Sequence, residues 1–174
     1  MKNHESVRII LINQDQELLL MCGDDPKITN KDGSYFGRFW FLVGGHIEHG
    51  ESVMDTAIRE LKEETGLNKD EVTFGPEVWH GEFEMVYEGK LTKMKQQFVV
   101  ANTNNRSVTL EYLTPSEQKI IEKVDWFSLN DICNSKEVIY PATLKDHLPD
   151  ILEKKYPKEP IWIDLAKKPS KITL

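Results

Sequence analysis

The stretch of residues 44–67, GGHIEHGESVMDTAIRELKEETGL, constrains the fold more than any other part of the chain. Ser52 followed by Asp55 is a capping-box pattern, which predicts that a helix begins there. Gly66 is placed to end that helix, because glycine readily adopts the left-handed conformation of a helix C-terminus. The stretch therefore predicts a glycine-rich turn followed by a helix over residues 52–66.

The predicted helix carries three glutamates on one side. Glu60, Glu63 and Glu64 occupy positions i, i+3 and i+4, which are neighbours on a helix surface, and each like-charge pair costs about 0.2–0.5 kcal/mol. A solvated charged face is one explanation. A hard divalent cation such as Mg²⁺, which prefers carboxylate oxygens, is the other. The helical wheel puts the acids between a core-facing stripe and a solvent-facing side; the stripe consists of Met54, Ala57, Ile58, Leu61 and Thr65.

Glycines upstream of the helix favour the metal interpretation. The paired Gly44 and Gly45 follow an expected strand directly, and adjacent glycines let another group approach the backbone closely. A plain turn is the alternative. Gly50 permits a second turn, so Glu51 is placed to fold back over the first helical turn and to add a carboxylate from outside the helix.

The remaining segments predict a mixed sheet flanked by helices rather than a regular alternation of strands and helices. We expect a single domain over residues 1–174. The expected elements are a hairpin (7–12 and 17–21), a long loop (23–38), a strand (38–43), a hairpin turning at 88–90 (82–87 and 93–101), a helix (114–124), a strand (124–129) followed by a short helix, a helix interrupted near Pro149 (140–157), and an edge strand in the C-terminal tail.

Composition restricts the class of protein. The net charge of −7 argues against a surface that coats nucleic acid, which would be basic. No run approaches the about 20 apolar residues of a membrane span, and the N-terminal apolar stretch is too short for a signal peptide. Cys22 and Cys133 fit no metal or redox spacing, which favours reduced thiols in a cytoplasmic protein.

The stretch resembles the Nudix box, the signature of the MutT-like Nudix hydrolases. That pattern is Gly, five residues, Glu, seven residues, Arg-Glu, a bulky aliphatic residue, any residue, Glu-Glu, any residue, Gly and an aliphatic residue. Residues 45–67 agree at every fixed position: Gly45, Glu51, Arg59, Glu60, Leu61, Glu63, Glu64, Gly66 and Leu67. Many members have Pro before the paired glycines, whereas this chain has Val43, which removes no ligand.

The resemblance implies an α/β/α sandwich, an α+β fold in which the box forms a strand, a loop and a helix. The C-terminal residues themselves favour a flexible tail over residues 166–174. The resemblance also implies hydrolysis of a nucleoside diphosphate linked to another moiety, with Mg²⁺ or Mn²⁺. Glu60 and Glu64 would be the main metal ligands, and Glu63 would be the next candidate ligand. The other implied roles are carboxylate orientation by Arg59 and a supporting or orienting role for Glu51. The backbone carbonyl of Gly44 or Gly45 would complete the metal shell, with Gly44 also a candidate for substrate binding and Gly45 for metal binding.

The general base is not defined by the box. Glu63 and Glu64 are candidates on the helix, and Glu117 is a candidate from a later loop, with Glu111 as a weaker competitor. Thr114 and Glu117 also form a capping-box pattern, so Glu117 has a purely structural alternative.

Aromatic residues before the box are candidates for substrate contacts, because base–aromatic stacking contributes about 1–3 kcal/mol. Tyr35 and Phe36 lie in the expected loop and fit a lid. Phe39 and Trp40 are expected to pack in the core instead. Trp79 is a further candidate for the pocket lining.

Two other functions are compatible with this fold. A nucleotide-binding module without catalysis often loses box glutamates, and this chain keeps all of them. A diphosphate isomerase is the second alternative, for which nothing in the sequence argues. The substrate class is thus a small nucleoside diphosphate derivative, nucleic acid and membranes are disfavoured as partners, and a homodimer is compatible with the family.

Overall fold

The computed structural model describes residues 1–168, which form one mixed eight-stranded sheet with the order β3-β5-β6-β1-β4-β2-β7 and with β8 paired to β5. The long β1 is central and runs parallel to β6 along its whole length. The strands are β1 Lys2–Asn13, β2 Leu18–Gly23, β3 Ile28–Thr29, β4 Phe39–His46, β5 Val72–Tyr87, β6 Lys90–Thr103, β7 Ile121–Phe127 and β8 Ile161–Trp162.

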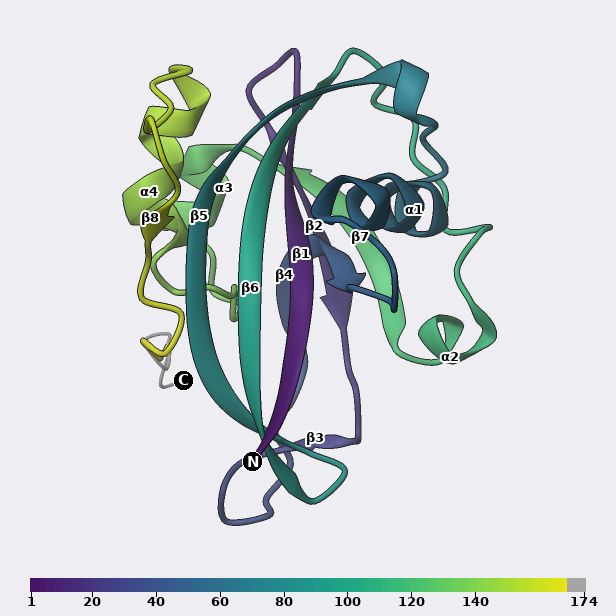
Figure 1. Cartoon of the computed structure of the whole chain (residues 1–174), viewed down its shortest axis with the longest axis vertical. Helices are drawn as coiled ribbons and strands as arrows, with labels where there is room; N and C mark the ends of the chain where they lie inside the picture. Colours follow the sequence, from purple (N-terminus) through teal and green to yellow (C-terminus); the bar gives the residue numbers. More distant parts are fainter. Residues whose placement is uncertain (169–174) are drawn as a thin grey trace.

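Helices cover both faces of the sheet, as Figure 1 shows, with α1 on one side and α3 and α4 on the other. This arrangement confirms the predicted mixed sheet between helices. Among the described residues, no helix is long and apolar enough to cross a membrane. The helices are α1 Val53–Thr65, the 3₁₀ turn η1 Lys69–Glu71, α2 Pro115–Gln118, α3 Leu129–Cys133 and α4 Leu144–Leu152.

The core consists of two apolar layers, because alternate residues of a strand point to opposite faces. Val7, Ile9 and Leu11 of β1 pack with Ala57 and Leu61 of α1. On the other face, Ile10 and Ile12 join a layer that includes the buried side of α4, formed by Leu144, Leu148 and Ile151. The near-continuous apolar run in β1 thus reflects burial on both faces.

Strand β4 changes its partner halfway along. Residues 39–42 pair with β2, whereas residues 43–46 pair with β1. Because β4 separates the two N-terminal strands, the predicted hairpin of β1 and β2 persists only beside its turn, at Ile12 and Leu18. Gly44 and Gly45 belong to β4 itself, which corrects the expectation that they follow the strand.

The predicted helix over residues 114–124 is wrong beyond its first turn. Only Pro115–Gln118 is helical, and Ile121–Phe127 forms β7, which pairs with β2. The start signal at Thr114 was genuine, but Ile121, Val124 and Trp126 pack against the α1-side core as a strand. Sheet pairing and burial therefore override a local helix signal.

The C-terminal half is close to expectation. Of the helix predicted over residues 140–157, only Leu144–Leu152 is helical, and α4 continues through Pro149, so the predicted interruption is wrong. The hairpin of β5 and β6 turns at Glu88 and Gly89, within the predicted turn at 88–90. Both residues have positive φ. Strand β8 provides the expected edge pairing, with β5. Of the predicted flexible tail, residues 169–174 lie outside the described residues.

Candidate active site

Helix α1 begins and ends where the sequence predicts. The Ser52 hydroxyl accepts a hydrogen bond from the backbone N–H of Asp55, and the Asp55 carboxylate accepts one from the backbone N–H of Ser52. Gly66 ends the helix at φ 79°. The side of the helix that carries the acids is buried, however, with Glu60 6% exposed and Glu64 2% exposed. These two carboxylates therefore lie at the edge of the core rather than between core and solvent. Conversely, Met54 of the predicted core stripe is 37% exposed.

The paired glycines make room for these carboxylates. The backbone N–H of Gly44 donates to Glu64 Oε1 at 3.0 Å. A Cβ atom at Gly45 would lie 2.4 Å from Glu60 Oε1, so any side chain there would displace that carboxylate. Gly44 has a φ of 140° and its backbone packs against Val7, so a side chain is excluded there as well.

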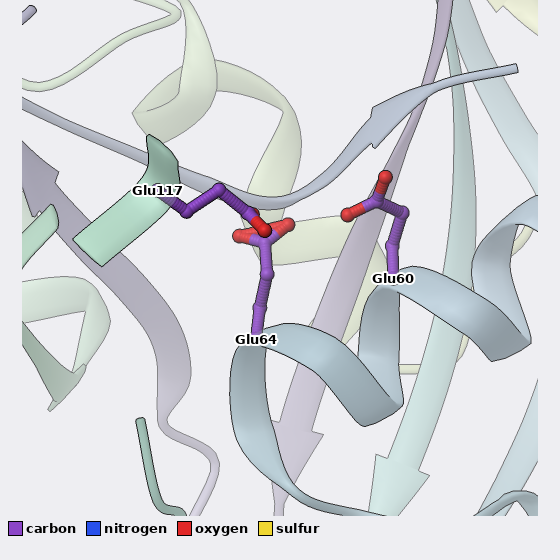
Figure 2. A group of neighbouring side chains, drawn as sticks. All are labelled: Glu60, Glu64 and Glu117. Carbon is purple, nitrogen blue, oxygen red and sulfur yellow. The ribbon is translucent and has the colours of Figure 1, made fainter. Parts of the chain in front are cut away.

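Glu117 joins Glu60 and Glu64 from a different element. One carboxylate oxygen from each of the three lies within 4.8 Å of the others. Figure 2 shows Glu60 and Glu64 projecting from α1 while Glu117 enters from α2 opposite them. The capping interaction also forms, because Thr114 N–H donates to Glu117 Oε1 at 3.1 Å. Glu117 therefore caps α2 and reaches the cluster at the same time.

The three carboxylates fit a divalent cation. Arg59 donates to Glu60 Oε1, Gly44 donates to Glu64 Oε1, and Thr114 donates to Glu117 Oε1. Within residues 1–168, no protein donor reaches the second oxygen, Oε2, of any of the three. A cluster of unpaired carboxylate oxygens at this spacing has the chemistry that hard cations require.

Arg59 connects the carboxylates to the strand. Its guanidinium makes a two-pronged pair with Glu51, at 2.8 Å for both contacts, and also bonds to Glu60 at 2.9 Å and to the carbonyl of His46 at 2.9 Å. Glu63 is a longer contact at 3.5 Å. The Thr56 hydroxyl and the backbone N–H of Glu48 also donate to the Glu51 carboxylate. Glu51 therefore holds Arg59 in place and lies outside the three-carboxylate cluster.

The charges of the site shift the pKa values of its acids in opposite directions. Burial and the neighbouring charge of Glu60 raise the pKa of Glu64 well above its usual range. Burial and the same charge also raise the pKa of Glu63. In contrast, the hydrogen bonds from Arg59 lower the pKa of Glu51 to about 2. Negative charge is thus crowded in this cluster, and a bound cation would relieve the repulsion.

Arg8 is a residue near the site that sequence reasoning missed. Its Nη1 donates to the carbonyls of Leu42 and Gly44, at 3.1 and 3.2 Å, where β4 changes partner. Burial lowers the pKa of Arg8, whereas the charges of Glu64 and Glu60 raise it. The available signal was a single arginine inside the otherwise apolar run of residues 7–12.

The predicted aromatic contacts divide into three groups. Tyr35 is 59% exposed and hydrogen-bonds to Asp24, whereas Phe36 is half-buried against other rings. Trp40 packs in the core at 3% exposure, as expected. Trp79 is only 1% exposed and belongs to the core on the α4 side, so the prediction that it lines the pocket is wrong.

The fold and the site define a class of α+β protein in which one helix, docked against a strand with paired glycines, presents a buried glutamate cluster. A family model described as the NUDIX domain matches residues 2–148. The chain therefore belongs to the Nudix family, as the box predicted.

Individual proteins agree with this assignment. An m7GpppN-mRNA hydrolase of Xenopus laevis is 30% identical over 95 residues, which cover 52% of this chain and 32% of that protein. The chain spans about a third or less of the length of the curated relatives it matches. A dihydroneopterin triphosphate pyrophosphohydrolase of E. coli shares the fold, with a TM-score of 0.60 and 15% identity, over 88% of this chain and 99% of that chain. A MutT protein of Methanosarcina mazei is similar at a TM-score of 0.57 and 21% identity, over 88% and 95% of the two chains.

Proposed function

We propose that this protein hydrolyses the diphosphate bond of a nucleoside diphosphate joined to another group, with Mg²⁺ as cofactor and Mn²⁺ as a substitute. The observation that carries the proposal is the cluster of Glu60, Glu64 and Glu117, each with one oxygen held by the protein and one oxygen left for a cation. The name of the Xenopus laevis relative, an m7GpppN-mRNA hydrolase, supports a nucleotide derivative as substrate.

A bound divalent cation would neutralise phosphate oxygens, activate water and stabilise the leaving group. The Oε2 atoms of Glu60 and Glu64 are the groups that would hold it. Arg59 keeps Glu60 in position, and Glu51 keeps Arg59 in position. Gly44 and Gly45 have no side chains, so only their backbone lies beside the cluster. A phosphate group can therefore approach the cluster there, and the carbonyl of Gly45 can reach a bound cation.

Water attacks phosphorus and the phosphoanhydride oxygen leaves, so a carboxylate must accept the proton of the water. Glu117 is the candidate that the geometry favours, because it brings a carboxylate oxygen to the cluster from α2 while Thr114 N–H holds its Oε1. Glu63 is the second candidate, because its raised pKa increases its affinity for a proton.

The direct test is a substrate panel with Mg²⁺ that contains ADP-ribose, nucleotide sugars, dinucleoside polyphosphates and nucleoside triphosphates. We expect turnover of at least one compound, strong loss of turnover in Glu64→Gln, and no loss in the exposed control Glu159→Gln. Folded, metal-loaded protein that turns over none of them contradicts the proposal. Tight nucleotide binding without turnover would favour the non-catalytic binding module.

A further inference from the structure

Four aromatic side chains form a continuous row beside the first half of β4. Phe36, Phe39, Phe41 and Tyr140 are all half-buried, and we call them the ring row. Phe39 is its centre, with ring centroids 5.4 Å from each of Phe36, Phe41 and Tyr140. The two outer rings, Phe36 and Tyr140, are also neighbours, at 5.8 Å.

The ring row lies on the α1 side of the sheet. Trp40 and Ile139 pair side by side, and both belong to the core on the α4 side. Because strand residues alternate between faces, Phe39, Phe41 and Tyr140 point to the opposite side. Phe41 indeed packs against the α1-side core. The carboxylate cluster and the ring row therefore share one face of the sheet.

Strand β4 connects the ring row to the carboxylate cluster. Phe41 is three residues before Gly44, whose N–H binds Glu64, so about 10 Å of strand separates the two. Arg8 lies between them, with its guanidinium carbon 5.8 Å from the centre of the Phe41 ring and Nη1 3.2 Å from the carbonyl of Gly44. The order along the strand is thus carboxylates, a cation, and then aromatic rings.

Gly23 leaves the space beside the Phe41 ring free of a side chain. This residue of β2 pairs with Phe39, and a Cβ atom on it would lie 3.0 Å from the ring of Phe41 and 3.5 Å from Ile121. A larger residue would push the ring aside. The glycine therefore leaves this position free of a side chain, and Phe41 stays half-buried.

We propose that the ring row is the subsite for a planar ring of the substrate, a nucleobase, whose diphosphate occupies the carboxylate cluster. The inference rests on the proposed function for the position of the diphosphate. It makes Phe39 and Phe41 specificity-determining residues, and β4 sets the distance between ring and phosphate. Stacking on such a platform strengthens binding about 5- to 150-fold per base.

The test compares a ligand that has a base with a ligand that lacks one. ADP and inorganic pyrophosphate are titrated calorimetrically in Mg²⁺ against the unmodified protein and three variants. Phe39→Leu removes the central ring and Phe39→Tyr keeps it. The matched control is Phe83→Leu, which removes a half-buried ring on β5 that packs against the opposite core.

We expect Phe39→Leu to weaken ADP binding about 5- to 150-fold and to leave pyrophosphate binding within about twofold. Phe39→Tyr and Phe83→Leu should retain ADP binding. Equal weakening of both ligands, unchanged ADP binding in Phe39→Leu, or no preference of the unmodified protein for ADP overturns the subsite. The substrate panel is scored separately: Phe39-dependent ADP binding without any turnover would refute the hydrolase and keep the subsite, whereas turnover without dependence on Phe39 would do the reverse.

Discussion

Gly44 and Glu64 are joined by a 3.0 Å hydrogen bond from the backbone N–H to Oε1, across 20 residues of sequence. The bond fixes the C-terminal part of α1 to β4 at the point where β4 leaves β2 for β1. Arg8 donates to the carbonyl of the same residue, Gly44. The position of a buried carboxylate therefore depends on the path of a strand.

The neighbouring glycine leads to the first prediction. In Gly45→Ala the new methyl group would meet Glu60 Oε1 at 2.4 Å, and the flexible carboxylate must move away. We expect a loss of about 10- to 100-fold in turnover, the usual cost of disturbing groups that orient a metal site, with the fold retained. Steady-state kinetics and circular dichroism measure the two effects. Gly75→Ala is the control, because its Cβ would make ordinary contacts at 3.4 Å or more.

A second prediction concerns metal binding itself. A cation that binds only the folded state at ten times its dissociation constant adds about 1.4 kcal/mol to the free energy of unfolding, which raises Tm by about 3–6 °C at this chain length. Millimolar Mg²⁺ or Mn²⁺ should therefore raise Tm, and Glu60→Gln should reduce the rise. In Glu159→Gln, an exposed change far from the cluster, the rise should persist. If neither metal changes the Tm of the unmodified protein, the result argues against a metal site at this cluster.

The two roles of Glu117 can be separated by a third experiment. Glu117→Gln keeps an oxygen that accepts from Thr114 but removes the charge in the cluster. If this carboxylate is the base, turnover should fall about 100-fold or more while Tm stays nearly constant. Thr114→Ala does the opposite: it removes a cap worth about 0.5–2 kcal/mol and should spare turnover. A purely structural Glu117 would leave turnover unchanged in Glu117→Gln.

Short-range sequence patterns predicted the part of the site that lies within one helix. Ser52, Asp55 and Gly66 define the ends of α1 by hydrogen bonds within a few residues, and helical spacing alone brings Glu60 and Glu64 together. Burial of these two acids was not predictable, because it depends on β4 lying against the helix. A helical wheel shows which residues share a side but not what covers that side.

Non-local pairing explains what the sequence could not predict. The insertion of β4 between β1 and β2 and the strand at residues 121–127 are both set by long-range sheet contacts. Trp79 is of a residue type that often contacts ligands, but the register of β5 points its side chain into the core. Arg8 acquires its role only because β4 brings the carbonyls of Leu42 and Gly44 to it.

The pH dependence of stability provides the last prediction, at a histidine outside the carboxylate cluster. His4 stacks on His46 with ring centroids 4.4 Å apart, and its buried Nδ1 has no hydrogen-bond partner among the described residues. Burial, followed by the charges of His46 and Arg8, lowers the pKa of His4 from 6.5 to about 4. The folded state thus disfavours protonation of this imidazole.

A lowered pKa in the folded state contributes stability above the unfolded value of 6.5, and that contribution is lost as the pH falls toward about 4. We therefore expect the free energy of unfolding, measured by urea denaturation, to decrease between pH 7 and pH 4.5 more steeply in the unmodified protein than in His4→Phe. That variant keeps a ring against His46 but cannot be protonated. His49→Asn, at an exposed histidine, should follow the unmodified protein. Identical slopes for the unmodified protein and His4→Phe would show that His4 titrates alike in the folded and unfolded states.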